Sequence, residues 1–369
     1  MKIPKLPIEI IDKIVLETGD ARIAHALKDK ISQYALNRIE KNILIYGDIQ
    51  GGKTNEIIKY IKENELDTKI LVIQNSLLVL SQYEQRFKSQ NVDYQIVDKN
   101  TETITKKLVL ILNNKYRYSY FQKVEPLKYI LMLDESDQTI LSCRLKAHVN
   151  VYKTVHITAT PFNKLSYDRY IKVQQNENYY GINDLNINLN NTDDEIKYVK
   201  KFTETEKGIM LINKYSYVGQ MTNCAKKLSD EFINIPIVVL TSDKILYLRK
   251  NKKIIRHKSI SKIIDVLKEY PHIIFIANRL SNRGLSYVSS DYSRHLTWQI
   301  TKIRANVTSF LQSLRILGIY NNKDNKKLNL QLVIGESEEK LFEKHLKFIN
   351  DFDVEKKMMY NIRNNWKNK

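Results

Sequence analysis

Short apolar runs alternate along this chain with longer segments in which apolar residues recur every three or four positions. Short runs bounded by turn residues are typical of buried strands, and the longer spacing is typical of amphipathic helices. In the first half of the chain, this pattern predicts a helix at Asn55–Glu63 and strands at Ile43–Tyr46, Tyr129–Leu133 and Thr154–Ile157. Strands of this kind favour a sheet that is covered on both faces.

The same alternation returns in the second half of the chain. It predicts helices at Gln220–Phe232 and Ser259–Tyr270, and strands at Gly208–Asn213, Ile237–Leu240 and Ile273–Ala277. Alternating strands and helices imply parallel βαβ units. The sequence therefore predicts an α/β protein.

A polar and acidic stretch at Asn188–Glu195 has the composition of a linker between two lobes. Two cores of ordinary size account for nearly all of the 369 residues. The predicted division is a helical segment at 1–40, a first lobe at 41–187, a linker at 188–200, a second lobe at 201–335 and a basic helical tail at 336–369.

A glycine-rich turn follows the first predicted strand and opens the first predicted helix. Glycine is scarce in the chain, with 10 in 369 residues, yet three stand in this turn, which disfavours the alternative of an ordinary turn before a helix. Glycines let successive backbone N–H groups point at phosphate oxygens, and the helix N-terminus attracts the same anion. The predicted phosphate-binding residues are Gly47, Gln50, Gly51, Gly52, Lys53 and Thr54.

Each polar group in and after this loop has an expected task. Lys53 is assigned to the β and γ phosphates of ATP, and the hydroxyl of Thr54 to Mg²⁺. Asp134 and Glu135 follow a wholly apolar strand, which delivers them to the carboxyl edge of the sheet, where ligands bind. Asp134 would hold Mg²⁺ through its water shell, and Glu135 would orient and deprotonate the attacking water.

Hydroxyl residues follow the next predicted strand in the segment Thr158-Ala159-Thr160-Pro161. Thr158 and Thr160 are expected to hydrogen-bond the acidic cluster, which also contains Asp137, and so to couple the γ-phosphate to the rest of the lobe.

The order of these three segments resembles that of the superfamily 2 helicases, whose cores carry a Walker A loop, an Asp-Glu-x-Asp box and a Thr-Ala-Thr-Pro segment. The resemblance implies two RecA-like parallel-sheet domains in tandem, a P-loop NTPase helicase core, here with helical N- and C-terminal extensions. It also implies that the strand and loop at Ile70–Leu80 touch the nucleic-acid backbone through Asn75 and Ser76.

Two segments of the second lobe extend the resemblance. Residues Asn278–Ser286 are similar to the family's Arg-Gly-Leu-Asp segment, so Arg283 and Gly284 are expected to line the cleft, although Ser286 stands where an acid is usual. The second segment, Gln312–Gly318, resembles the final helicase motif.

In that motif the glutamine faces the nucleotide, so Gln312 takes this role, and Arg315 becomes the arginine finger. The family often has a second arginine nearby, where Tyr320 stands here. The alternative for Arg315 is a surface arginine on an amphipathic helix. As a set, the motifs resemble a divergent viral or plasmid-type branch better than the classical DEAD-box group.

The charge of the chain agrees with a polyanionic partner. The formal net charge is +19 and the pI is about 9.5, which favours DNA or RNA through counterion release. Between Asp243 and Asp265 there is no acid, and this basic segment is expected to track a nucleic-acid backbone or to wedge a duplex; a solvated basic loop is the alternative. Its candidate contacts are Arg249, Lys250, Lys252, Lys253, Arg256 and Lys258.

Other classes of chemistry lack residues in a suitable pattern. The two cysteines, Cys143 and Cys224, have no paired spacing and predict neither a zinc site nor a disulfide. No apolar run approaches the roughly 20 residues that span a bilayer. We therefore expect a soluble, intracellular protein of the cytoplasm or of a viral or plasmid replication compartment.

The sequence favours an ATP-dependent nucleic-acid helicase or translocase with ATP and Mg²⁺ as cofactors. An alternative is a nucleotide-switched adaptor or ATPase subunit of a replication or transcription complex, which would dock on a protein partner through residues 1–40. A metabolic P-loop kinase is a third class, disfavoured by the second lobe. The choice between DNA and RNA stays open.

Overall fold

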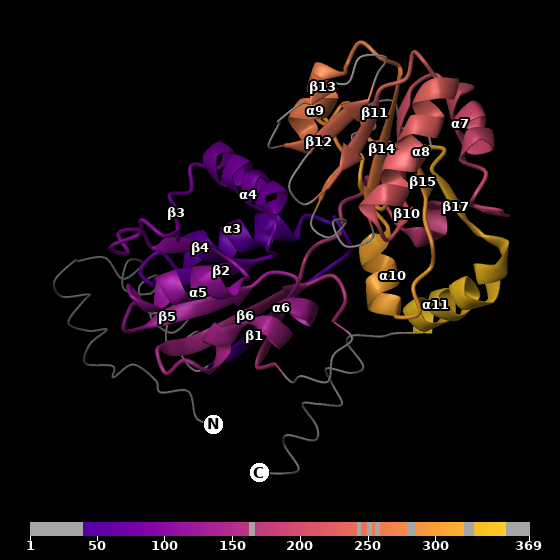
Figure 1. Cartoon of the computed structure of the whole chain (residues 1–369). Helices are drawn as coiled ribbons and strands as arrows, with labels where there is room; N and C mark the ends of the chain where they lie inside the picture. Colours follow the sequence, from indigo (N-terminus) through magenta and orange to yellow (C-terminus); the bar gives the residue numbers. More distant parts are fainter. Residues whose placement is uncertain are drawn as a thin grey trace, which may run out of the picture.

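The computed structural model describes residues 40–161, 167–241, 245–248, 253–254, 259–278, 285–320 and 328–351. These residues form two α/β lobes, drawn from indigo to magenta and from pink to yellow in Figure 1. The predicted N-terminal segment up to residue 39, and with it the proposed docking region, lies outside the described residues, as does the end of the basic tail beyond residue 351.

The first lobe is built on a seven-stranded sheet in which every neighbouring pair of strands is parallel. Its strand order is β3-β4-β2-β5-β6-β1-β7. The strands are β1 (Asn42–Tyr46), β2 (Lys69–Ile73), β3 (Gln95–Ile96), β4 (Leu108–Leu112), β5 (Tyr129–Leu133), β6 (Val151–Thr158) and β7 (Arg169–Lys172).

Helices cover both faces of this sheet. Apolar residues of α3 (Lys53–Glu63) and α4 (Leu77–Ser89) pack on one face, and those of α5 (Lys115–Gln122), α6 (Ser136–Ser142) and the 3₁₀ turn η1 (Arg144–Ala147) pack on the other. Because both faces are covered, every residue of β2, β4 and β5 is buried, and their sequences are almost wholly apolar rather than alternating. Each buried Leu or Ile side chain contributes about 1.5–3 kcal/mol to folding.

The second lobe has an eight-stranded sheet with the order β13-β12-β11-β14-β10-β15-β17-β9. Its strands are β9 (Asn186–Asn190), β10 (Gly208–Tyr215), β11 (Ile237–Leu240), β12 (Ile245–Leu248), β13 (Lys253–Ile254), β14 (His272–Asn278), β15 (Leu296–Ile300) and β17 (Gln331–Gly335). The strands from β11 to β9 in this order are parallel, whereas β12 and β13 add an antiparallel edge.

Helices also cover both faces of this second sheet. Helices α7 (Glu195–Thr203) and α8 (Val218–Glu231) pack on one face. The helices α9 (Ile260–Val266), α10 (Val307–Ser313) and α11 (Glu339–Asp351) contribute to the core on the other face. The 3₁₀ turns η2 (Ile182–Asp184) and η3 (Glu336–Glu338) precede β9 and α11.

A small antiparallel ladder joins the two halves of the chain. It pairs β8 (Tyr179–Tyr180), which follows the first lobe in sequence, with β16 (Gly318–Ile319), which follows α10. The backbone N–H of Tyr320 also donates to the carbonyl of Asn178 at 3.0 Å. This ladder fixes the end of the Gln312–Gly318 segment beside the first lobe.

The predicted α/β class with two parallel-sheet domains is confirmed, and most predicted elements have counterparts. The helix predicted at Ser259–Tyr270 is shorter, because α9 ends at Val266. The segment predicted as a linker is folded instead: β9 pairs with β17, and the buried side chains of α7 pack in the second lobe.

The predicted basic segment contains the strands β12 and β13, so it is not a loop throughout. The domain boundaries stay a prediction.

Cys143 and Cys224 are both free and buried, each within a different lobe. In the part of the chain that the structure describes, every helix is too short or too polar to cross a bilayer.

Candidate active site

The glycine-rich loop connects β1 to α3 and holds the conformation that a phosphate cradle needs. Gly52 caps α3 with a φ of 94°, in the left-handed region where glycine is favoured. A side chain at Gly47 would place its Cβ 2.7 Å from the Cβ of Val173, so the chain passes too closely there for any larger residue. Gln50 is also left-handed, with a φ of 55°. The loop is therefore compact and shaped by its backbone.

Lys53 stands at the first position of α3 and reaches back over the loop. Its Nζ donates to the carbonyl of Asp48 at 2.8 Å. Burial lowers the pKa of Lys53, and the nearby carboxylates of Glu135 and Asp134 raise it again, while Arg315 lowers it. The ammonium thus lies within electrostatic reach of both acidic residues and of an arginine from the second lobe.

The acidic residues follow β5, as the sequence predicts. Glu135 caps α6 in the left-handed region, with a φ of 47°, which for a side-chain-bearing residue is a strained backbone. Burial raises the pKa of Asp134 to about 7, the neighbouring Glu135 raises it too, and a hydrogen bond with Tyr83 opposes both. The ionised form of Asp134 is therefore disfavoured unless a cation lies beside it.

The structure brings the predicted coupling residues together. The hydroxyl of Thr158 donates to Oδ1 of Asp137 at 3.1 Å, and it lies 3.3 Å from the hydroxyl of Thr160. The backbone N–H of Thr160 donates to the same Thr158 hydroxyl at 3.0 Å. The end of β6 is therefore tied to the acidic turn after β5.

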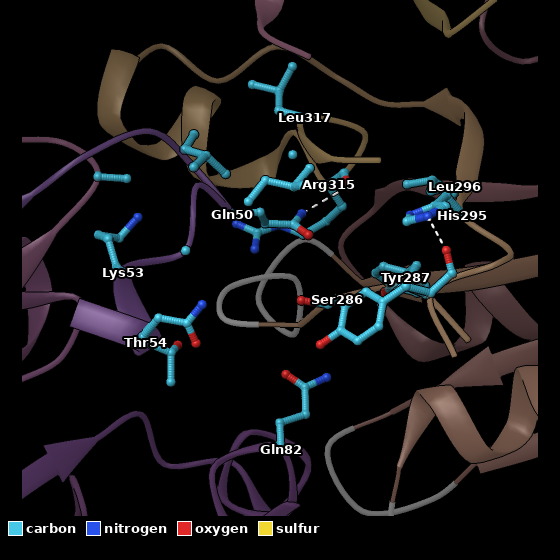
Figure 2. Close-up of a pocket in the computed structure, with 18 of the residues that line it drawn as sticks. Gln50, Lys53, Thr54, Gln82, Ser286, Tyr287, His295, Leu296, Arg315 and Leu317 are labelled. Atoms are coloured by element: carbon cyan, nitrogen blue, oxygen red, sulfur yellow. Dashed lines mark hydrogen bonds between the residues drawn. The ribbon is translucent and has the colours of Figure 1, made fainter. Parts of the chain in front are cut away.

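The side chains of Gln312 and Gln50 connect the two lobes at the site. Nε2 of Gln312, at the end of α10, donates to Oε2 of Glu135 at 2.8 Å. Nε2 of Gln50 donates to the carbonyl of Arg315 at 2.9 Å, the contact dashed in Figure 2. The segment after α10 therefore touches both the phosphate loop and the acidic turn.

Arg315 is buried rather than on the surface, with 4% of its area exposed. Its guanidinium donates to the carbonyl of Gln312 and lies 3.3 Å from Oε1 of the same residue. Its backbone N–H donates to Oε1 of Gln299 at 2.9 Å, and the N–H of Ile316 donates to the same oxygen at 3.0 Å. The alternative of a surface arginine is therefore wrong.

A cavity of about 520 Å³ lies where these groups meet. Figure 2 shows Lys53 and Thr54 on one side of it, with Ser286, Tyr287 and Arg315 from the second lobe facing them. The first lobe also contributes Gln50, Gln82, Tyr83, Arg86, Asp134, Glu135, Asn176 and Asn178. Further lining residues of the second lobe are Asp291, Tyr292, His295, Gln312 and Tyr320.

The residues present fit a magnesium-bound triphosphate. The space above Gly52 is open, since a Cβ there would meet only Cδ1 of Ile319, at 3.9 Å. The hydroxyl of Thr54 and the carboxylate of Asp134 are hard oxygen donors of the kind that Mg²⁺ selects. The crowded carboxylates and the Lys53 ammonium supply charges of both signs at the points where a cation and an anion would bind.

The residues predicted to touch nucleic acid lie apart from the cavity or outside the described residues. Ser76 caps α4, accepting from the N–H of Val79, and Asn75 accepts from Nδ2 of Asn114 at 2.8 Å; their contact with nucleic acid stays a prediction. The backbone of Lys253 lies in β13. The residues Arg283, Gly284, Arg249, Lys250, Lys252, Arg256 and Lys258 lie outside the described residues.

Sequence reasoning missed three residues that touch the candidate site. Tyr83 and Arg86 reach it from α4, and Gln299 from β15, where it is fully buried. A signal existed only for Gln299, since a glutamine within the apolar run Leu296–Ile300 must satisfy its amide internally. Tyr83 and Arg86 belong to an ordinary amphipathic helix, whose pattern does not indicate which polar tip meets a site.

No family model matches the chain, and no curated protein matches it. Solved structures do share its fold. The structure of Dbp5 from S. cerevisiae bound to RNA and ADP BeF3 is similar over 85% of this chain and 84% of that one, with a TM-score of 0.57 and 11% identity. A second structure of S. cerevisiae Dbp5, bound to gle1 and ip6, gives a TM-score of 0.52 at 11% identity, over 85% and 83%.

RecG bound to a three-way DNA junction is similar over 87% of this chain, with a TM-score of 0.51 and 14% identity. The similar region covers 43% of the RecG chain, so this chain spans less than half of that protein. At these identities the likeness concerns the fold. The chain therefore shares the fold of these structures, two RecA-like domains in tandem. The narrower viral or plasmid-type branch stays a prediction.

Proposed function

We propose that this chain is an ATP-dependent nucleic-acid motor, a helicase or translocase of the superfamily 2 type. The observation that carries the proposal is the cavity between the lobes, where the phosphate loop and acidic turn of one lobe meet Gln312 and Arg315 of the other. A site divided in this way couples chemistry to the relative position of two lobes.

Each side chain has a task in hydrolysis. Lys53 neutralises charge on the β and γ phosphates, and Thr54 and Asp134 would hold Mg²⁺, which supplies further positive charge to the same oxygens. Glu135 orients the attacking water and takes its proton. Arg315 neutralises the charge that develops on the transferred phosphoryl group, an effect of about 10³ to 10⁵ in rate.

The hydrogen bonds explain how hydrolysis would move the lobes. Gln312 and Gln50 connect the lobes at Glu135 and Arg315, so separating the lobes withdraws the arginine and frees the carboxylate. Hydrogen bonds connect Asp137 to Thr158 and Thr158 to Thr160, so a movement of the acidic turn would also move the end of β6. Cycles of closure and opening would then advance the chain along nucleic acid.

The nucleic-acid partner is supported by charge and by the solved structures of the same fold. The net charge of +19 favours a polyanion, and two of the similar structures are bound to nucleic acid, Dbp5 to RNA and RecG to a DNA junction. Backbone contacts are proposed for Asn75, Ser76 and the basic segment between Asp243 and Asp265.

Steady-state ATPase measurements test the proposal. We would compare wild type, Glu135→Gln and the exposed control Glu65→Gln without nucleic acid and with single-stranded DNA, duplex DNA and single-stranded RNA at one salt concentration. The proposal requires hydrolysis that a nucleic acid stimulates, that Glu135→Gln lowers at least about 100-fold, and that Glu65→Gln keeps. Hydrolysis indifferent to all three nucleic acids would instead indicate a nucleotide-switched adaptor.

A further inference from the structure

Arg86 lies beside the phosphate loop, although it belongs to neither the loop nor the acidic turn. It stands in the last turn of α4, and its Nη1 donates to Oγ1 of Thr54 at 2.6 Å. It lines the same cavity as Lys53 and Arg315. Within the described ranges these three are the only lysine or arginine side chains that line the cavity.

The charge of Arg86 has no carboxylate partner in the described part of the chain: its hydrogen-bond acceptor there is the neutral hydroxyl of Thr54. A half-buried guanidinium beside a neutral hydroxyl is incompletely compensated, because taking a cation out of water is costly without an anion. The site is therefore prepared for an anionic ligand at this point.

Thr54 cannot serve Arg86 and a divalent cation at once. Its hydroxyl oxygen would contact both the guanidinium of Arg86 and the metal ion. Two positive charges on one oxygen atom repel each other strongly in a partly buried site. If Thr54 held a metal ion, the guanidinium of Arg86 would therefore have to leave this hydroxyl. The anionic acceptors that arrive with a magnesium-bound triphosphate are its phosphate oxygens, which a guanidinium binds well.

The second lobe supplies no second arginine directly after Arg315, because residues Ile316–Tyr320 contain no lysine or arginine. The same helix that carries Arg86 also carries Tyr83, which hydrogen-bonds Asp134, so α4 touches both proposed magnesium ligands.

We propose that Arg86 is a second phosphate-binding arginine, supplied by the first lobe, which exchanges the hydroxyl of Thr54 for the terminal phosphate when a magnesium-bound nucleoside triphosphate enters. This inference rests on the proposed function, because it assigns a ligand contact within the same site. Removing the Arg86 side chain should therefore weaken nucleotide binding only when both the third phosphate and the metal are present.

Binding of mant-labelled ADP and of a mant-labelled non-hydrolysable ATP analogue tests the assignment, each with magnesium and with EDTA. In magnesium, Arg86→Ala weakens the triphosphate about 10-fold or more, as the loss of a charge-assisted hydrogen bond implies, and weakens ADP less than about 3-fold. In EDTA, where Arg86 stays on Thr54, the variant changes triphosphate affinity less than about 2-fold. Arg86→Gln gives the same selective loss and keeps a side chain of similar length.

Lys88→Ala, on the exposed side of the same helix turn, is the matched control and retains wild-type affinities. Equal weakening of ADP and triphosphate would reduce Arg86 to a support for the loop and overturn the assignment, as would unchanged affinities in both Arg86 variants. If the wild type itself bound neither nucleotide in magnesium, the proposed function would fail, and this inference with it.

Discussion

Nε2 of Gln312 lies 2.8 Å from Oε2 of Glu135, although the two residues are 177 positions apart and belong to different lobes. The carboxylate that we assign as general base is therefore oriented by the opposite lobe. A hydrogen bond to a charged group is worth about 1.5–3 kcal/mol, which is enough to bias the position of a catalytic side chain. In this protein, the geometry of hydrolysis depends on the contact between the lobes.

Removing this contact should affect catalysis more than binding. We expect Gln312→Ala to lower kcat about 10- to 100-fold, the equivalent of the missing hydrogen bond, and to change KM for ATP less than about 3-fold. Gln220→Ala, at an exposed position of α8, is the control and should behave as wild type. A raised KM with an unchanged kcat would assign Gln312 to ground-state binding of the nucleotide instead.

Gln299 should act through Arg315, since its Oε1 accepts from the backbone of Arg315 and Ile316 while its Nε2 donates to the carbonyl of Ser313 at 2.8 Å. We expect Gln299→Leu to lower the free energy of unfolding by about 1–3 kcal/mol, because these buried groups lose their partner. Its kcat should fall in the same direction as that of Arg315→Ala.

The double variant separates positioning from a general loss of stability. If Gln299 works by positioning Arg315, the double variant Gln299→Leu/Arg315→Ala should have the same kcat as Arg315→Ala alone. Without the Arg315 guanidinium, the loss of Gln299 has no catalytic group to displace. If the fold-loss of kcat in the double variant equalled the product of the two single losses, Gln299 would act on the site independently of Arg315. Urea unfolding followed by circular dichroism gives the stability of each variant.

The basic segment makes a prediction about salt. Replacing Arg249, Lys250, Lys252 and Lys253 by glutamine should weaken nucleic-acid binding and flatten the slope of log K against log salt, by about 0.9 for each duplex phosphate that the variant no longer neutralises. The control replaces the same number of exposed lysines elsewhere: Lys62, Lys88, Lys123 and Lys226. Equal slopes in the two variants would remove the segment from the proposed track.

A buried histidine should make the first lobe sensitive to acid. His156 lies in β6 with 4% of its area exposed, edge-on to Tyr167, and burial lowers its pKa to about 4. The unfolded chain has a pKa near 6.5 for this group, so between about pH 6.5 and 4 the unfolded state binds more protons and stability falls as the pH falls.

From pH 7.5 to pH 5 this one group should cost about 2 kcal/mol of folding free energy. His156→Phe keeps a ring and cannot titrate, so its urea midpoint should fall less over this interval than that of wild type. The same pH dependence in both proteins would show that His156 is not the group responsible.

Strands are predictable from this sequence because their signal is local. Tyr129–Leu133 and Ile237–Leu240 are buried on both faces, so their runs of apolar residues correspond to β5 and β11 without any knowledge of neighbours. The polar stretch that begins at Asn188 shows the opposite case, because exposed edge strands and linkers share a composition. Only its pairing with β17 makes it part of a sheet.

Local patterns in the sequence were enough to predict the two α/β halves and the candidate groups of the phosphate loop and acidic turn, since a glycine-rich turn and a strand end are short-range features. Three contacts became known from the folded chain alone: Gln312 with Glu135, Gln299 with the backbone of Arg315, and Arg86 with Thr54. These contacts join residues far apart in the chain. Their distances follow from how strands, helices and lobes pack, and no local pattern of residues encodes them.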